Sequence, residues 1–111
     1  MKEFDEYQAL AIRTAKRVDE KYDLTHAALG MSGEVGELVD AIKKHVIYGR
    51  PLDRVNVVEE VGDILWFAAF LCATTGIDLR EAAQLNIDKL KLRYPETYSD
   101  VFAHQRLDKG E

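Results

Sequence analysis

The stretch VVEEVGDILWFAAFLCA, Val57–Ala73, places acidic residues and a glycine at the start of an otherwise apolar segment. Its last ten residues, Ile64–Ala73, are apolar on every side of a helix. A helix that is apolar all round is buried all round. Because the other helices expected in this short chain can hardly cover it, we expect a second copy of the chain to pack against this segment.

The rest of the chain also has helical character, and no segment has the alternating pattern of a β-strand. We predict an all-α fold in one domain, residues 1–111, with a tail after about residue 96 that has no clear period. Short connections between four helices favour antiparallel neighbours, as in a four-helix bundle that oligomerisation completes. The expected helices cover residues 4–21, 25–48, 53–75 and 78–94.

Short sequence signals mark the ends of these helices. Thr25 is a candidate N-cap for the second helix, and Gly49 followed by Pro51 marks its end. Asp78 and Glu81 have the spacing of a capping box at the start of the fourth helix. We therefore expect three tight connections between four helices.

The composition limits the classes of function. The chain has 111 residues, is 47% hydrophobic and carries a formal net charge of −5, which suits one globular domain. Nucleic-acid-binding proteins usually carry a basic patch, and this sequence has only small clusters of lysine and arginine, so we expect no nucleic-acid partner. A nucleotide remains compatible with the negative charge if a metal cation bridges the two.

Cysteine content and hydropathy indicate the compartment. Cys72 is the single cysteine, so no disulfide can form within the chain, as is usual in the reducing cytoplasm. The N-terminal segment is acidic and amphipathic, unlike a signal peptide. The longest apolar run, Ile64–Ala73, is too short to cross a bilayer. We expect a cytoplasmic protein without a membrane partner.

Two acidic pairs share one helical spacing. Glu34 and Glu37 are three residues apart, as are Glu60 and Asp63, so each pair lies on one face of its helix. Most such pairs belong to a solvated face with salt bridges to lysines. Here the pairs share their faces with alanine, leucine and phenylalanine, and Lys44 near Glu37 is the one matching cation. The acids therefore point towards the core side, where they would repel one another and raise their pKa values.

A divalent cation would remove this repulsion. Hard cations such as magnesium bind carboxylate oxygens and keep some of their waters. Gly33, Gly36 and Gly62 lack side chains, so a neighbouring helix or a ligand can come close. A di-iron centre is the alternative for a helical bundle, but it requires Glu-x-x-His on two helices, and no histidine here fits that pattern. All-oxygen ligation favours magnesium, with manganese as a substitute.

At these residues the sequence resembles the MazG-like, all-α nucleoside triphosphate pyrophosphohydrolases. The pattern of that family is Glu-x-x-Glu followed by Glu-x-x-Asp. Here it reads Glu34-Val-Gly-Glu37 and Glu60-Val-Gly-Asp63, separated by 22 residues. The surrounding LGMSGEVGELVDAIKK, EEVGDILWF and NIDKLKLRYP strengthen the resemblance, which extends from Leu10 to Phe102.

The resemblance implies a reaction in which a nucleoside triphosphate and water give a monophosphate and pyrophosphate, in nucleotide-pool control or removal of particular nucleotides. It implies two or four assembled chains, and magnesium held by Glu34, Glu37, Glu60 and Asp63. A carboxylate that is not fully used as a ligand can take the proton of the attacking water. Glu34 and Glu37 are both candidates for that role, and Glu59 is a candidate extra ligand or hydrogen-bond acceptor.

The segment NIDKLKLRYP is similar to the closing helix of the family. Asn86, Lys89 and Arg93 lie on one face of it. In the functional interpretation Asn86 supports the metal site or the sugar, while Lys89 and Arg93 bind phosphate oxygens; the alternative is a solvated basic face. The further substrate-binding candidates are Lys44 for phosphate, Tyr94 for the ribose and His26 for the base.

Two other functions stay open at this point. One is a non-catalytic helical oligomer of the same fold that binds nucleotides or a protein partner, and the other is a metallo-oxidase of the bundle type. Two complete acidic pairs favour the enzyme over the binding protein, and the missing Glu-x-x-His pattern argues against the oxidase. The sequence leaves the identity of the base open.

Overall fold

The computed structural model describes residues 1–94 and 99–105. This described part is helical, with turns between the helices and no strand, so the predicted all-α fold is confirmed. The helices are α1 (Lys2–Ile12), α2 (Glu20–Val46), α3 (Arg54–Thr74), α4 (Leu79–Arg93) and α5 (Asp100–Gln105).

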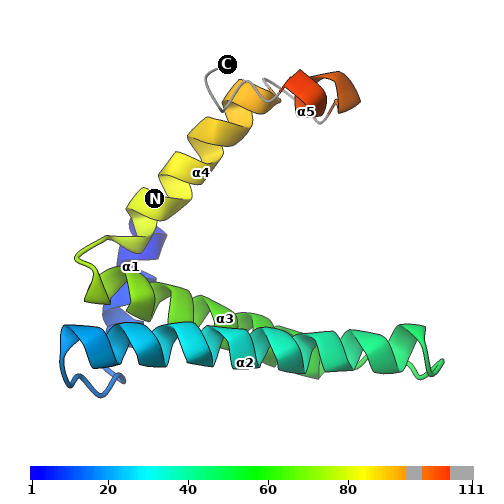
Figure 1. The fold of residues 1–111 in the computed structure, drawn as a ribbon, viewed down its shortest axis with the longest axis horizontal. Coiled ribbons are helices and arrows are strands. Elements are labelled where there is room, and N and C mark those ends of the chain that lie inside the picture. The colour runs from blue at the N-terminus through cyan, green and yellow to red at the C-terminus, as the bar shows by residue number, and fades with distance from the viewer. Residues whose placement is uncertain (95–98, 106–111) are drawn as a thin grey trace.

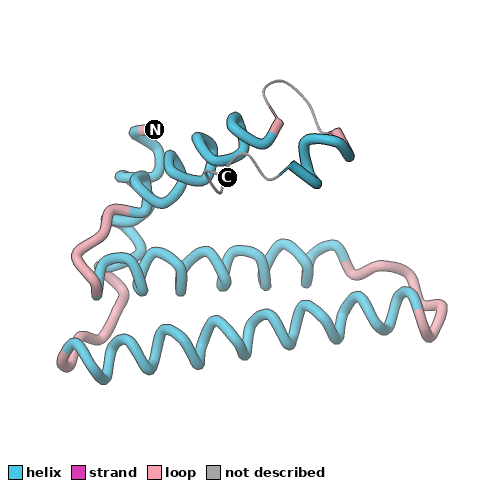
Figure 2. The backbone as a smooth tube through the Cα atoms, turned by 45° about the horizontal axis from the view of Figure 1, so that its top comes forward, coloured by secondary structure: helices cyan, strands magenta, loops and turns pink. Residues whose placement is uncertain are grey.

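Helices α2 and α3 form a long antiparallel hairpin, as the short connection predicted (Figures 1 and 2). Ala27 and Ala41 of α2 are buried, and such small side chains let the two helices pack closely. A second cluster lies where α1, α3 and α4 meet, and it contains Ala11, Ala69 and Leu79. The core is therefore divided between the hairpin and the contact of α1 with the start of α4.

The expected four-helix bundle does not close within one chain. Helix α4 leaves the end of α3 and leads away from the hairpin (Figure 1). The radius of gyration is 17.0 Å, whereas a compact domain of this length would have one of about 13 Å. A single chain therefore leaves much of α2, α3 and α4 without a neighbouring helix.

The turn between α1 and α2 lies earlier than predicted. Helix α1 ends at Ile12 rather than near Lys21, and α2 begins behind Asp19, whose carboxylate accepts a hydrogen bond from the Tyr22 N–H at 2.8 Å. Thr25, the expected N-cap, lies inside α2, where its hydroxyl donates to the carbonyl of Lys21. No glycine or proline marks this turn, so the apolar period alone favoured one longer helix.

Two other predicted helix ends also need correction. Asp78 is the N-cap of α4 but makes no side-chain capping hydrogen bond, so the expected capping box with Glu81 is not formed. Helix α2 ends at Val46, and Gly49 follows in the left-handed region with φ of 69°. The tail, expected to be irregular, contains the short helix α5.

The apolar segment Ile64–Ala73 is only partly covered within one chain. Ala69 and Phe70 are buried, Leu65 is exposed, and the other residues of the segment are half-buried. More exposed apolar side chains lie towards the end of the hairpin where α2 connects to α3; they are Val39, Val46, Ile47, Val55, Val58 and Val61. In the described part of the chain, no helix has the length and apolar character needed to cross a membrane.

Candidate metal centre

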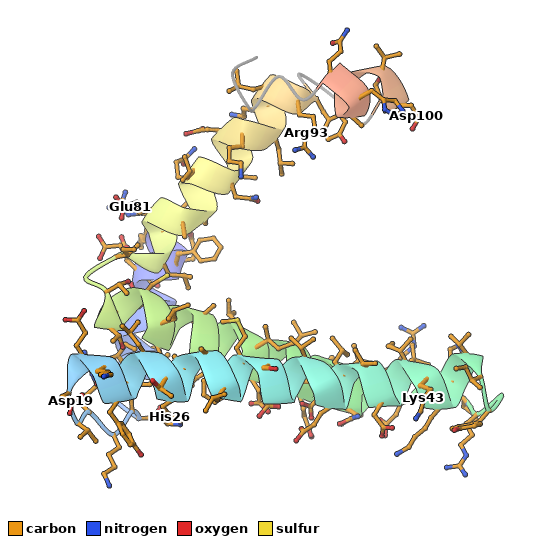
Figure 3. All side chains as sticks on the ribbon, in the orientation of Figure 1. Asp19, His26, Lys43, Glu81, Arg93 and Asp100 are labelled. Carbon is orange, nitrogen blue, oxygen red and sulfur yellow. The ribbon has the colours of Figure 1, made fainter. Side chains whose placement is uncertain are left out.

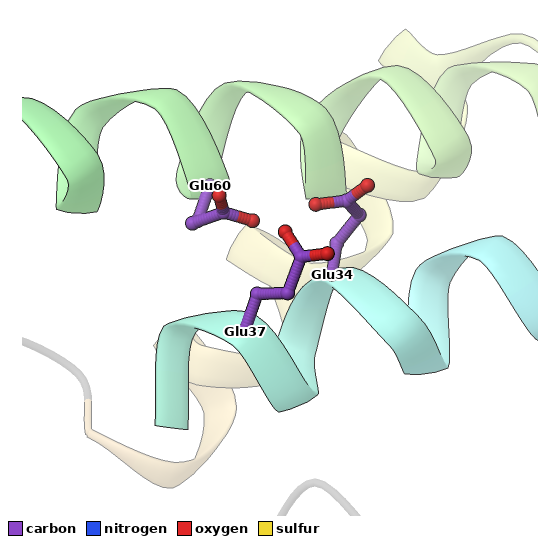
Figure 4. A group of neighbouring side chains, drawn as sticks. All are labelled: Glu34, Glu37 and Glu60. Carbon is purple, nitrogen blue, oxygen red and sulfur yellow. The ribbon is translucent and has the colours of Figure 1, made fainter. Parts of the chain in front are cut away.

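Three carboxylates meet between the two helices of the hairpin. Glu34 and Glu37 project from α2, and Glu60 projects towards them from α3 (Figure 4). One oxygen of each side chain lies within 4.8 Å of the other two. The three-residue spacing of Glu34 and Glu37 puts both on one face of α2, and the antiparallel hairpin brings Glu60 opposite them. We call these three residues the acidic group.

The acidic group is partly withdrawn from water. Glu60 is 6% exposed, Glu34 is half-buried and Glu37 is exposed. Within the described part of the chain, the Oε2 atoms of Glu34 and Glu60 are buried and have no hydrogen-bond partner. An unpaired buried carboxylate oxygen is costly, so the hairpin alone does not satisfy this group.

The neighbouring acids change the titration of Glu60. Its pKa is raised from 4.5 to about 8, chiefly because a protonated Glu60 can hydrogen-bond to Glu34, and further because burial and Glu37 disfavour its charge. This bears out the predicted upward shift for Glu60. Near neutral pH the acidic group therefore holds a proton that a cation can replace.

The acidic group fits a hard divalent cation. All its donors are carboxylate oxygens, which magnesium and manganese prefer over softer ligands. The two unpartnered oxygens offer positions that a cation would satisfy. Glu37 lies at the exposed side, where a bound cation would also be open to a water or a phosphate oxygen.

Asp63 is the predicted ligand that the structure does not bring into the acidic group. Its carboxylate is exposed on α3 and lies near enough to Tyr7 of α1 to affect that phenol. Burial raises the pKa of Tyr7, and the charge of Asp63 raises it further. Glu59 is also exposed and outside the acidic group. One chain therefore assembles three of the four predicted ligands.

The predicted cations lie apart from the acidic group. The Nζ atom of Lys44 lies 3.0 Å from Oδ2 of Asp40, one turn earlier on α2, and this hydrogen bond lowers the pKa of Asp40. Asn86 and Lys89 are exposed on α4. Arg93 lies at the far end of α4, away from α2 and α3 (Figure 3). A single chain therefore does not place the α4 row, Asn86, Lys89 and Arg93, beside the carboxylates.

The aromatic candidates have different surroundings. Tyr94 is half-buried, and the guanidinium of Arg93 lies over its ring, 5.8 Å from the centroid. His26 is exposed and makes edge contacts to the rings of Phe67 and Phe70 at centroid distances of 5.9 and 5.6 Å. It lines a pocket of about 270 Å³ whose other lining residues are Tyr22, Thr25, Leu29 and Gly30. This pocket is two helical turns before the acidic group on α2.

The glycines differ from expectation. A Cβ atom added at Gly33, Gly36 or Gly62 would meet no atom within 4 Å outside its own helical turn, so no other described segment approaches these three closely. The close approach is at Gly30, where an added Cβ would collide with the ring of Phe67. Gly30 lies four residues before Glu34, and residues four apart share a face of a helix. This spacing is the sequence signal that could have indicated that Gly30 faces α3.

Comparison with known proteins agrees with these features. A model of the MazG nucleotide pyrophosphohydrolase domain matches residues 23–98. The chain is 31% identical over 77 residues to the Gene 37 protein of Mycobacterium phage L5, a match that covers 63% of this chain and 65% of that protein. It thus spans slightly less than two thirds of the length of this relative. No solved structure matches the chain. Because the matched region covers more than half of the chain and includes both acidic pairs, the chain belongs to the MazG nucleotide pyrophosphohydrolase domain family.

Proposed function

We propose that the chain is a magnesium-dependent nucleoside triphosphate pyrophosphohydrolase. It converts a ribo- or deoxyribonucleoside triphosphate and water into the monophosphate and pyrophosphate, and so controls the nucleotide pool of the cytoplasm. Manganese can substitute for magnesium. The observation that carries this proposal is the convergence of Glu34, Glu37 and Glu60 in a chain of this family.

The carboxylates divide the work according to their burial. Glu34 and Glu60 would hold the cation through their buried oxygens, and Asp63, three residues after Glu60 on α3, would be the fourth ligand. A bound magnesium ion neutralises the triphosphate and lowers the pKa of a bound water. Glu37 is the exposed member, and its exposure supports the proposal that it meets the attacking water and accepts its proton.

The substrate-binding row on α4 acts on the site of another copy in a dimer or tetramer. Two observations support this arrangement: α4 leads away from the hairpin of its own chain (Figure 1), and apolar residues of α2 and α3 are exposed. Lys89 and Arg93 then bind phosphate oxygens across the interface, and Asn86 contacts the sugar or supports the metal site. Tyr94 packs on the ribose, and Lys44 exchanges Asp40 for a phosphate oxygen.

The pocket beside His26 is the proposed place of the base. Eight residues separate His26 from Glu34 on α2, a rise of about 12 Å, and both residues contact side chains of α3. A flat base can stack against the aromatic side chains there.

A panel of ribo- and deoxyribonucleoside triphosphates tests the reaction. The purified protein is incubated with magnesium in ¹⁸O-labelled water, and the products are separated by anion exchange. We expect equal amounts of monophosphate and pyrophosphate, with the label in the monophosphate because water attacks the α-phosphorus, and no reaction in excess EDTA.

Two variants accompany this assay. Glu34→Gln should remove activity, whereas Glu3→Gln, an exposed carboxylate change on α1, should not. Diphosphate and inorganic phosphate as products would contradict the proposed bond cleavage, and full turnover in EDTA would contradict the metal. Nucleotide binding without turnover would instead favour the non-catalytic binding protein.

A further inference from the structure

Gln8 is a buried polar side chain in the contact between α1, α3 and α4. It is 9% exposed, and its amide reaches three backbone groups. The Nε2 atom donates to the carbonyls of Ala69 and Ile77, both at 3.2 Å. The Oε1 atom accepts the N–H of Leu79 at 3.0 Å. One side chain of α1 is thereby bonded to α3, to the following turn and to the first residue of α4.

The bond to Leu79 replaces a cap that α4 lacks. The first N–H groups of a helix have no partner within the helix and are usually satisfied by a capping side chain. Asp78, at the N-cap position, makes no such bond. Gln8 supplies it from another helix, at a place where Leu79 is only 6% exposed.

A second contact between α1 and α4 lies next to this one. Asp5 is three residues before Gln8, on the same face of α1, and its Oδ2 atom lies 3.1 Å from Nε of Arg80. Both side chains are half exposed, so this ion pair adds little stability. Like the hydrogen bonds of Gln8, however, the ion pair restrains the position of α4 relative to α1, because it joins α1 to the first turn of α4.

Beyond its first turn, the described part of the chain buries little of α4. Leu79 is the buried residue of this helix, and most residues from Glu81 to Leu92 are exposed. From Leu79 to Arg93 the axis rises by about 21 Å, so a tilt of about 10° at the base moves the far end by about 4 Å. A small change at Gln8 is therefore magnified at the row of Asn86, Lys89 and Arg93.

We infer that Gln8 is a positioning residue: by capping α4 from α1, it fixes the direction in which α4 leaves the hairpin and so places Lys89 and Arg93 for the triphosphate. The capping step depends only on the contacts above. The step to the triphosphate rests on the proposed function. A distance measurement and a kinetic measurement separate the two steps.

The distance measurement uses spin labels at Lys21→Cys on α2 and Lys91→Cys on α4, in a Cys72→Ala background. The labelled protein is mixed with excess unlabelled protein so that distances within one chain dominate. With Gln8 in place we expect a single narrow distribution. Gln8→Met keeps the length of the side chain but loses all three hydrogen bonds, and it should broaden or shift the distribution by several ångströms. An unchanged distribution would overturn the capping role.

The kinetic measurement compares the same variant with a matched control. In Gln8→Met we expect KM for the best nucleoside triphosphate to rise roughly tenfold while kcat stays within a few-fold, because displaced phosphate contacts weaken substrate binding. Gln84→Ala removes an exposed hydrogen bond between Gln84 and Asp88 within α4 and should match the parent in both assays. A changed distance distribution with parental KM would overturn the role in substrate binding.

Two further outcomes are distinguishable. If Gln8→Met loses its helical circular dichroism, Gln8→Asn is used in its place. The asparagine side chain keeps the amide but is one carbon shorter, so it cannot reach all three backbone groups. The same change in the distance distribution is expected, and its absence again overturns the inference. If the parent protein hydrolyses no nucleoside triphosphate, the proposed function fails, and the distance measurement still decides the capping role.

Discussion

Glu60→Gln should remove a pH dependence of stability that the acidic group creates. The folded chain holds a proton on Glu60 up to a pKa of about 8, whereas an unperturbed glutamate releases it near 4.5. Between these values the folded state binds more protons than the unfolded state, so its stability falls as the pH rises. The metal-free protein should therefore have a melting temperature that declines from about pH 5 to about pH 8 and then levels off.

The same proton sets the pH dependence of cation binding. A carboxylate must lose its proton to become a ligand, so below its pKa the apparent affinity for magnesium should rise roughly tenfold per pH unit, with about one proton released per cation bound. Above about pH 8 the affinity should become independent of pH and proton release should stop. Glu60→Gln should abolish this slope and weaken the binding itself.

Calorimetric titration with magnesium in buffers of different ionisation enthalpy counts the released protons, and thermal melts in EDTA report the metal-free stability. Glu3→Gln is the matched control, because it removes one exposed carboxylate of α1 outside the acidic group. An affinity that does not vary with pH below about 8 in the parent would refute the reasoning. Equal pH slopes of melting temperature in the parent and in Glu60→Gln would do the same.

Three other predictions test separate parts of the structure. Glu37→Gln should lower turnover by a factor on the order of 10² or more, as for a lost general base or ligand, without loss of fold; a product assay that finds turnover within a few-fold of the parent would remove Glu37 from the site. Gly30→Ala should lower the free energy of unfolding by about 1 kcal/mol or more, because the added methyl group meets Phe67. Gly33→Ala, with open space around it, should raise the free energy of unfolding by up to about 1 kcal/mol. A denaturant titration that finds equal effects for the two substitutions would contradict the close approach at Gly30. Light scattering should show a dimer or tetramer, with the tetramer preferred, and a monomer at low micromolar concentration would refute the assembly.

The sequence was sufficient to predict the hairpin and most of its acidic group. Glu34 and Glu37 share a face because of their spacing alone, and the short connection between α2 and α3 requires an antiparallel partner for that face. It was not sufficient to place Asp63. Whether this side chain faces α2 or α1 depends on how α3 is rotated about its axis relative to both helices. The rotation is set by packing, as in the contact of Gly30 with Phe67, and no local pattern carries it.

The end of α1 and the direction of α4 depend on contacts between distant residues. The turn after Ile12 is held by Asp23, which is 3% exposed and accepts hydrogen bonds from the Val18 N–H at 3.1 Å and from Arg17 Nε at 3.2 Å. Local propensity alone continued the helix through this turn. The cap of α4 likewise comes from Gln8, 71 residues before Leu79. A glutamine on the apolar face of α1 was visible in the sequence, but its partners were not.

The hairpin and α4 have separate roles in the proposed site. The carboxylates lie on two long helices packed against each other, so within one chain the hairpin sets the separation of Glu34 and Glu60. The proposed phosphate-binding residues lie on α4, whose direction is set at one end and whose length carries Arg93 away from the hairpin. Metal binding should therefore survive a change at Gln8 that weakens substrate binding. Conversely, a change at Glu60 should alter metal binding and leave the direction of α4 unchanged.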